Sequence, residues 1–143
     1  MTTNESNSVT ISDAIRNYLD TVKLSRSIHT MLAYKNALKV FRDVLVEKNL
    51  SPHNTPIEKL TEDLISPLAG YLKTYSPTTE QLYLQAVKGF YEYVDSERLT
   101  EINLSRVRVL IRQRSRRPGI RLPQFPAEDI ERIRELGPIM RET

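Results

Sequence analysis

Apolar residues recur three and four positions apart in four successive segments of this 143-residue chain, which is the spacing of amphipathic helices. The expected helices start at Ile11, Ser27, Thr61 and Ser76. Loops are predicted at residues 23–26 and 50–56, and Asn49 is the expected stop of the second helix. Apart from one stretch discussed below, no segment shows a convincing strand pattern. We therefore predict an all-α fold, a bundle of four main helices.

Short local motifs predict how these helices begin and where one of them breaks. Thr10 followed by Asp13 resembles a capping box. Ser76 before Pro77 places a hydroxyl cap ahead of a proline at the first helical position. Pro67 lies inside the third apolar pattern, so we expect it to kink or divide that helix.

The positive charge of the chain is concentrated in one stretch. Residues 106–121 hold seven arginines and no acidic residue, whereas the parts before and after each carry a net charge of −2. Charge gathered in this way points to a polyanionic partner. The apolar residues of this stretch fit a short helix, but the alternation from Arg106 to Val109 also fits a strand. The pattern leaves both open.

The apolar periodicity and the charge distribution divide the chain into four parts. The last helical pattern, near the C-terminus, has one apolar stripe and little to pack on, which resembles the start of a second domain that the sequence cuts short. The parts are a disordered tail at 1–10, the helical bundle at 11–105, a basic interdomain linker at 106–126 and a short C-terminal helix within 127–143.

Composition excludes several classes of chemistry. The chain has no cysteine, and its two histidines, His29 and His53, are too few for a histidine-rich metal site. It has no glycine-rich phosphate loop and no hydrolase motif, so we expect no catalytic residue, no metal and no small-molecule cofactor. The N-terminus lacks a secretory signal and no apolar stretch spans a bilayer. These absences predict a soluble, cytoplasmic protein with no membrane partner.

The positive indications concern nucleic acid. Guanidinium groups match phosphate oxygens, so the arginine run is suited to follow a phosphate backbone, although a solvated linker is the alternative. The starts of the second and fourth helices are also crowded with small polar donors, more than capping requires. These donors are Ser25, Arg26, Ser27, His29 and Thr30, then Ser76, Thr78, Thr79 and Gln81.

Three motifs resemble the tyrosine recombinases, the phage integrase family. Ser27-x-x-Thr30-x-x-x-Tyr34-x-x-x-Leu38-x-x-Phe41 looks like the second helix of that family's core-binding domain. The pattern from Thr79 to Val94, with Leu84-Gln85-Ala86-Val87-Lys88 inside it, is similar to the fourth helix. Residues 122–130 resemble the linker and the first helix of the catalytic domain.

The resemblance implies a SAM-like bundle that forms one half of a clamp around double-stranded DNA, alongside other recombinase protomers. Helices two and four would cross the major groove, although Leu82 stands where the family usually has a basic residue. The implied DNA-binding residues, with those of the helix starts, are Arg26, Ser27, His29, Thr30, Lys35, Asn36, Thr78, Thr79, Gln81, Gln85, Lys88, Arg112, Arg114, Arg116 and Arg117.

The family's catalytic tyrosine and its arginine, lysine and histidine partners belong to a C-terminal domain and have no matching positions in this sequence. Residues 127–143 would be the first helix of that domain, and the catalytic domain itself is expected to be absent. We therefore expect DNA binding without strand cleavage. The alternative is a helical protein-interaction module whose basic arm binds an acidic partner or mediates self-association.

Overall fold

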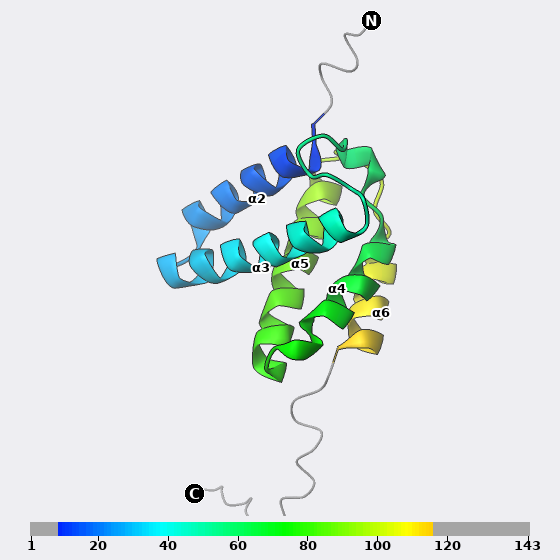
Figure 1. The fold of residues 1–143 in the computed structure, drawn as a ribbon. Coiled ribbons are helices and arrows are strands. Elements are labelled where there is room, and N and C mark those ends of the chain that lie inside the picture. Colours follow the sequence, from blue (N-terminus) through cyan, green and yellow to red (C-terminus); the bar gives the residue numbers. More distant parts are fainter. Residues whose placement is uncertain (1–8, 116–143) are drawn as a thin grey trace, which may run out of the picture.

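The computed structural model describes residues 9–115, and this part of the chain is all-α, as predicted (Figure 1). Its α-helices are α2 (Ile11–Ser25), α3 (Ile28–Glu47), α4 (Ile65–Tyr71), α5 (Pro77–Ser96) and α6 (Leu104–Arg114). Single 3₁₀ turns are η1 (Ile57–Lys59), η2 (Glu62–Leu64) and η3 (Leu72–Thr74). The described range holds one isolated antiparallel bridge, between Thr10 and Pro56, and no strand. The predicted tail and short C-terminal helix lie outside the described residues.

The predicted caps are present. The Thr10 hydroxyl accepts from the Asp13 amide at 3.1 Å, and the Asp13 carboxylate accepts from the Thr10 amide at 3.4 Å. Ser76 caps α5, with Pro77 as its first residue. Asn49 follows α3 in the left-handed conformation, with a φ of 65°. This residue ends α3 where the sequence predicted, because an asparagine adopts that conformation at low cost.

One expectation about helix boundaries needs revision. The predicted loop at 23–26 is wrong, because α2 continues to Ser25. Its last three residues are all exposed, and the one apolar side chain among them, Leu24, is 88% exposed and off the buried stripe. Pro67 was expected to kink or divide the third helix, and that segment is divided into η2 and α4, with α4 beginning two residues before Pro67. It is the third residue of α4, where the first-turn amide makes no bond to a residue four earlier.

The stretch that fitted either a helix or a strand forms helix α6. Val107, Leu110 and Ile111 lie on one side of α6 and are buried. Residues 106–114, which the sequence analysis placed in an interdomain linker, therefore belong to the bundle. The sequence favoured neither form because the apolar spacing of so short a stretch fits both periods.

The helices pack on both sides of α5. The α2–α3 pair crosses it, while α6 packs against it from another direction and α4 lies beside α6 (Figure 1). Phe41 of α3 and Phe90 and Tyr91 of α5 are fully buried where these helices cross. Their ring centroids are 6.1–6.2 Å apart in edge-to-face arrangements. This aromatic cluster joins the two halves of the bundle.

Gly89 permits the close approach of α2 to α5. The Tyr18 hydroxyl of α2 donates to the Ala86 carbonyl at 3.0 Å. A Cβ atom placed at Gly89 would lie only 2.4 Å from that hydroxyl oxygen. The tyrosine ring also contacts the rings of Tyr34 and Phe90. A side chain at position 89 would therefore displace a ring that is held from several sides.

We expect Gly89→Ala to destabilise the bundle by about 1–3 kcal/mol, since overpacking outweighs the gain in helix propensity. Gly70→Ala is the matched control, because a Cβ atom at Gly70 meets nothing within 4 Å. That change should raise stability by up to about 1 kcal/mol. Urea unfolding monitored by circular dichroism measures both variants. Equal effects of the two changes would contradict the role given to the Tyr18 contact.

Two buried tyrosines link stability to alkaline pH. Burial raises the pKa of Tyr18 above its usual value. Burial also raises the pKa of Tyr91, and the neighbouring Glu62 and Asp63 carboxylates add to this effect. The folded state therefore holds both phenols neutral at a pH where an unfolded chain, with a tyrosine pKa of about 10, releases the protons.

The stability that depends on these phenols is fully present below about pH 10 and is lost above it. At pH 11 each tyrosine should cost about 1.4 kcal/mol of the free energy of unfolding. Urea midpoints at pH 8 and pH 11 test this expectation. Tyr91→Phe should make the loss between the two pH values smaller. The exposed Tyr71 provides the control, since Tyr71→Phe should leave the loss unchanged.

Candidate nucleic-acid interface

The starts of α3 and α5 share one capping arrangement. The Ser27 hydroxyl accepts from the Thr30 amide at 3.2 Å and donates to the Thr30 hydroxyl at 3.1 Å. Ser76 repeats both bonds with Thr79, at 3.2 and 3.0 Å. Each threonine hydroxyl thus accepts from its serine and keeps its own hydrogen to donate. Both helix starts present a donor of the kind that contacts phosphate oxygens.

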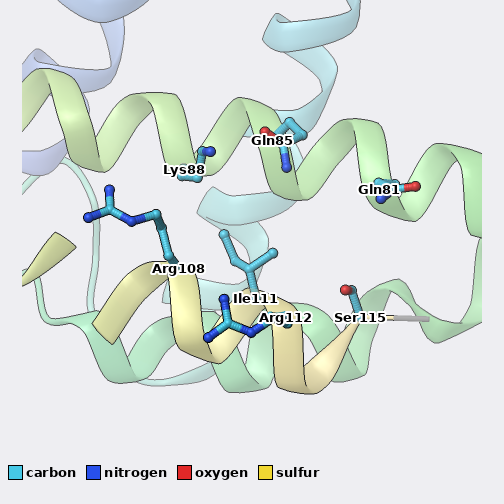
Figure 2. Close-up of a pocket in the computed structure, with 7 residues that line it drawn as sticks. All are labelled: Gln81, Gln85, Lys88, Arg108, Ile111, Arg112 and Ser115. Atoms are coloured by element: carbon cyan, nitrogen blue, oxygen red, sulfur yellow. The ribbon is translucent and has the colours of Figure 1, made fainter. Parts of the chain in front are cut away.

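A groove of about 420 Å³ runs between α5 and α6 (Figure 2). Gln81, Gln85 and Lys88 line it from successive turns of α5. Arg108 and Arg112 line it from α6, one turn apart, and no acidic residue is among its described lining residues. Within residues 9–115, these five side chains make no hydrogen bond or ion pair with the chain. The groove is therefore polar and cationic, and its donors are available.

A smaller hollow of about 350 Å³ continues from this groove towards α2 and α3. It shares Gln85 and Lys88 with the groove and adds Arg26 and Tyr34. Glu92 is the acidic residue among its described lining residues. The fold thus brings five of the predicted DNA-binding residues to one continuous surface. They are Arg26, Gln81, Gln85, Lys88 and Arg112.

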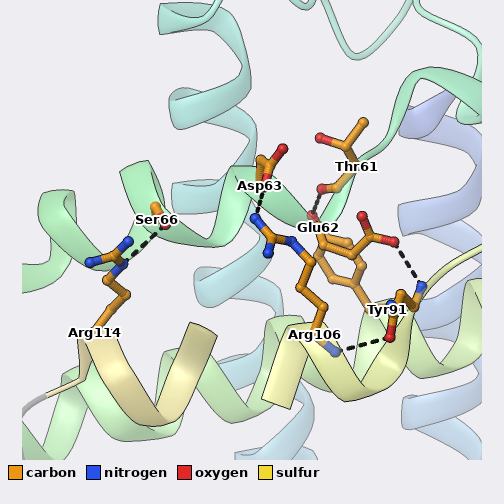
Figure 3. Close-up of polar contacts among 8 residues, drawn as sticks. Thr61, Glu62, Asp63, Ser66, Tyr91, Arg106 and Arg114 are labelled. Atoms are coloured by element: carbon orange, nitrogen blue, oxygen red, sulfur yellow. Dashed lines mark hydrogen bonds and ion pairs between the residues drawn. The ribbon is translucent and has the colours of Figure 1, made fainter. Parts of the chain in front are cut away.

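Polar contacts hold the opposite side of α6 against η2 and α4 (Figure 3). Arg106 pairs with Asp63, and this hydrogen bond raises the pKa of the arginine. The Arg114 Nε donates to the Ser66 hydroxyl at 3.2 Å. At the start of α6, the Asn103 amide donates to the Glu62 carboxylate at 2.7 Å. Arg106 and Arg114 therefore face away from the groove that Arg108 and Arg112 line.

A buried ion pair completes this attachment at the end of α6. The Lys73 ammonium donates to the Glu80 carboxylate at 2.7 Å and to the Arg114 backbone carbonyl. The Glu80 side chain has no exposed surface, whereas that of Lys73 is 41% exposed. Lys73 thus links α6 to the first turns of α5.

The structure divides the other predicted residues among different places. Lys35 and Asn36 line a separate groove between α2 and α3. Arg114, as described above, contacts α4. Arg116 and Arg117 lie outside the described residues. Arg108 belongs to the predicted arginine run but not to the predicted set of DNA-binding residues, and its spacing of four from Arg112 is the signal that indicates a shared face.

Within residues 9–115 no group of histidine, cysteine, aspartate or glutamate side chains is arranged to hold a metal ion. No helix in that range is both long enough and apolar enough to cross a membrane. The candidate surface presents amide, ammonium and guanidinium groups, which bind anions and hydrogen-bonding edges, with Glu92 as the carboxylate among its described lining residues.

Comparison with known proteins adds one match. The family model described as phage integrase, N-terminal SAM-like domain, matches residues 15–98, which is more than half of the chain. No curated protein and no solved structure matches the chain. The matched range covers most of α2 and all of α3, α4 and α5, and it ends before α6. The arginines of α6 are thus outside the part that the family describes.

We expect Lys73→Met to destabilise the bundle by about 1–2 kcal/mol, because it removes a cation from a buried carboxylate. The expected effect is smaller than for a fully buried pair, since Lys73 is partly exposed. Lys88→Met removes the same charge where the described residues provide no partner, and it should leave stability nearly unchanged. Thermal unfolding measures both variants. If Lys88→Met costs as much as Lys73→Met, the ion pair has no special structural role.

Proposed function

This chain belongs to the phage integrase, or tyrosine recombinase, family through its N-terminal SAM-like domain, and we propose that it is the core-binding domain that holds double-stranded DNA. It would act beside other recombinase protomers, while a catalytic domain elsewhere in the protein exchanges the strands. The observation that carries the proposal is the groove between α5 and α6, with its unpartnered cations and amides.

The chemistry of the groove supports DNA as the ligand. Lys88, Arg108 and Arg112 place three positive charges along it with no acid among the described lining residues. Guanidinium groups bind phosphate oxygens through paired donors. Gln81 and Gln85 add amides of the type that reads the major-groove edge of adenine. A duplex offers phosphates and base edges together, so it uses both kinds of side chain.

Residues beside the groove extend the proposed surface. Arg26 reaches it through the shared hollow. The starts of α3 and α5 contribute Ser27, His29, Thr30, Thr78 and Thr79. Arg116 and Arg117 would continue the phosphate contacts along the chain that follows. We propose that all of these groups bind and orient DNA and that none of them takes part in cleavage.

A double substitution tests the groove directly. Each phosphate contact contributes about −0.9 to the slope of log K against log salt. Arg108→Gln with Arg112→Gln should therefore flatten the slope by about two units on any duplex sequence. Arg106→Gln with Arg114→Gln removes the same charge from the other side of α6 and should change the slope by well under one unit. Fluorescence anisotropy with a labelled duplex gives the slopes.

Three outcomes would contradict the proposed interface, each in a different way. Equal flattening by both pairs would mean that total charge, and not the groove, determines binding. An unchanged slope for the groove pair would remove α6 from the interface. If the unsubstituted chain fails to bind duplex DNA even at low salt, the proposed function is wrong.

A further inference from the structure

A second groove, of about 610 Å³, runs between α2 and α3 and shares no lining residue with the surface proposed for DNA. Its apolar lining comes from both helices, with Ile15 and Leu19 on α2 and Met31 and Leu38 on α3. It extends from Ser12 to Lys23 along α2, which corresponds to about 16 Å, or three helical turns. The groove thus has an apolar floor of defined length.

Positive charges line both sides of this floor. Lys35, Lys39 and Arg42 follow one another at helical spacing on α3, and Lys23 lines the groove from α2. Within the described range, none of these four side chains makes a hydrogen bond or ion pair with the chain. Asp20 is the acidic residue among the described lining residues. A ligand in the groove therefore meets an apolar floor between cations.

Arg42 adds a donor that the described residues leave without an acceptor. Its Nε atom is buried and has no hydrogen-bond partner among the described residues. A buried donor without an acceptor destabilises a fold, so such atoms are rare in proteins. A guanidinium group binds a carboxylate through two parallel donors. A carboxylate on a partner would pair with the Arg42 guanidinium from the groove side.

We propose that the groove between α2 and α3 docks an acidic amphipathic helix of a partner protein. An apolar stripe of about three turns would cover the floor, and carboxylates on its flanks would pair with the lysines and Arg42. Nucleic acid fits this groove less well, because a phosphate backbone has no apolar surface to cover the floor. No phenylalanine, tyrosine or tryptophan is among the described lining residues, and His53 is the one ring there on which a base could stack. Lys35 and Asn36 would then contact this partner helix.

The test uses the full chain and a defined probe. The probe is a fluorescein-labelled synthetic helix of about three turns, with leucines on one stripe and glutamates beside it. Fluorescence anisotropy should show saturable binding that weakens with added salt. Matched peptides with glutamine for glutamate, or with serine for leucine, should each bind at least about tenfold more weakly.

Substitutions in the groove locate the binding. Lys23→Gln with Lys39→Gln, two groove lysines outside the predicted DNA-binding set, should weaken peptide binding by about tenfold and leave duplex affinity unchanged. Lys48→Gln with Lys59→Gln is the matched control, since both lysines are exposed and neither lines the groove. That pair should leave peptide binding unchanged. Arg108→Gln with Arg112→Gln should also leave it unchanged.

Arg42→Met separates a binding role from a structural one. Because the buried Nε has no partner, replacing the guanidinium by an apolar chain should keep or raise the melting temperature. The same variant should bind the acidic peptide at least about tenfold more weakly. A large fall in melting temperature would show that Arg42 is a structural residue and would count against the proposal.

Three further results would overturn the proposal. The acidic peptide and its glutamine version could bind equally. The control lysine pair could weaken peptide binding as much as the groove pair. The groove pair could weaken duplex binding as much as the α6 arginine pair, which would assign the groove to DNA. Peptide and duplex affinities are measured separately, so failure here is distinguishable from failure of the proposed function.

Discussion

The attachment of α6 to the bundle determines which surface this protein can offer to a partner. Val107, Leu110 and Ile111 bury one side of the helix, and polar contacts with η2, α4 and η3 hold both of its ends. Once this orientation is set, the arginines of α6 divide between two sides of the helix. Arg106 and Arg114 contact the fold, while Arg108 and Arg112 line an open groove.

Two grooves with different chemistry follow from the arrangement of helices around α5. The groove between α5 and α6 presents amides and cations to its ligand. The groove between α2 and α3 presents an apolar floor between cations. The first suits the duplex that we propose as its ligand, and the second suits the acidic amphipathic helix that we propose for it. In both cases the proposed partner follows from which side chains the packing brings together.

Much of the fold was predictable because the sequence motifs that start and stop its helices act within a few residues of the chain. A serine or threonine cap needs only the amide three residues ahead, so Thr10, Ser27 and Ser76 mark helix starts correctly. The extra turn of α2 was missed because its residues are exposed and its one apolar residue, Leu24, does not extend the buried stripe. The form of residues 106–114 was undecided because a short apolar pattern fits two periods. Burial against α4 and α5 selects the helix.

The amino-acid sequence by itself determined the all-α class, the main helix starts and the concentration of arginines that points to an anionic partner. Caps and apolar periodicity act within a few residues of the chain, which is why they can be read directly. Only the tertiary structure decided which arginines are available and that Arg42 has a buried, unpartnered donor. These properties depend on how helices far apart in the sequence turn their faces to one another, and no local pattern encodes that rotation.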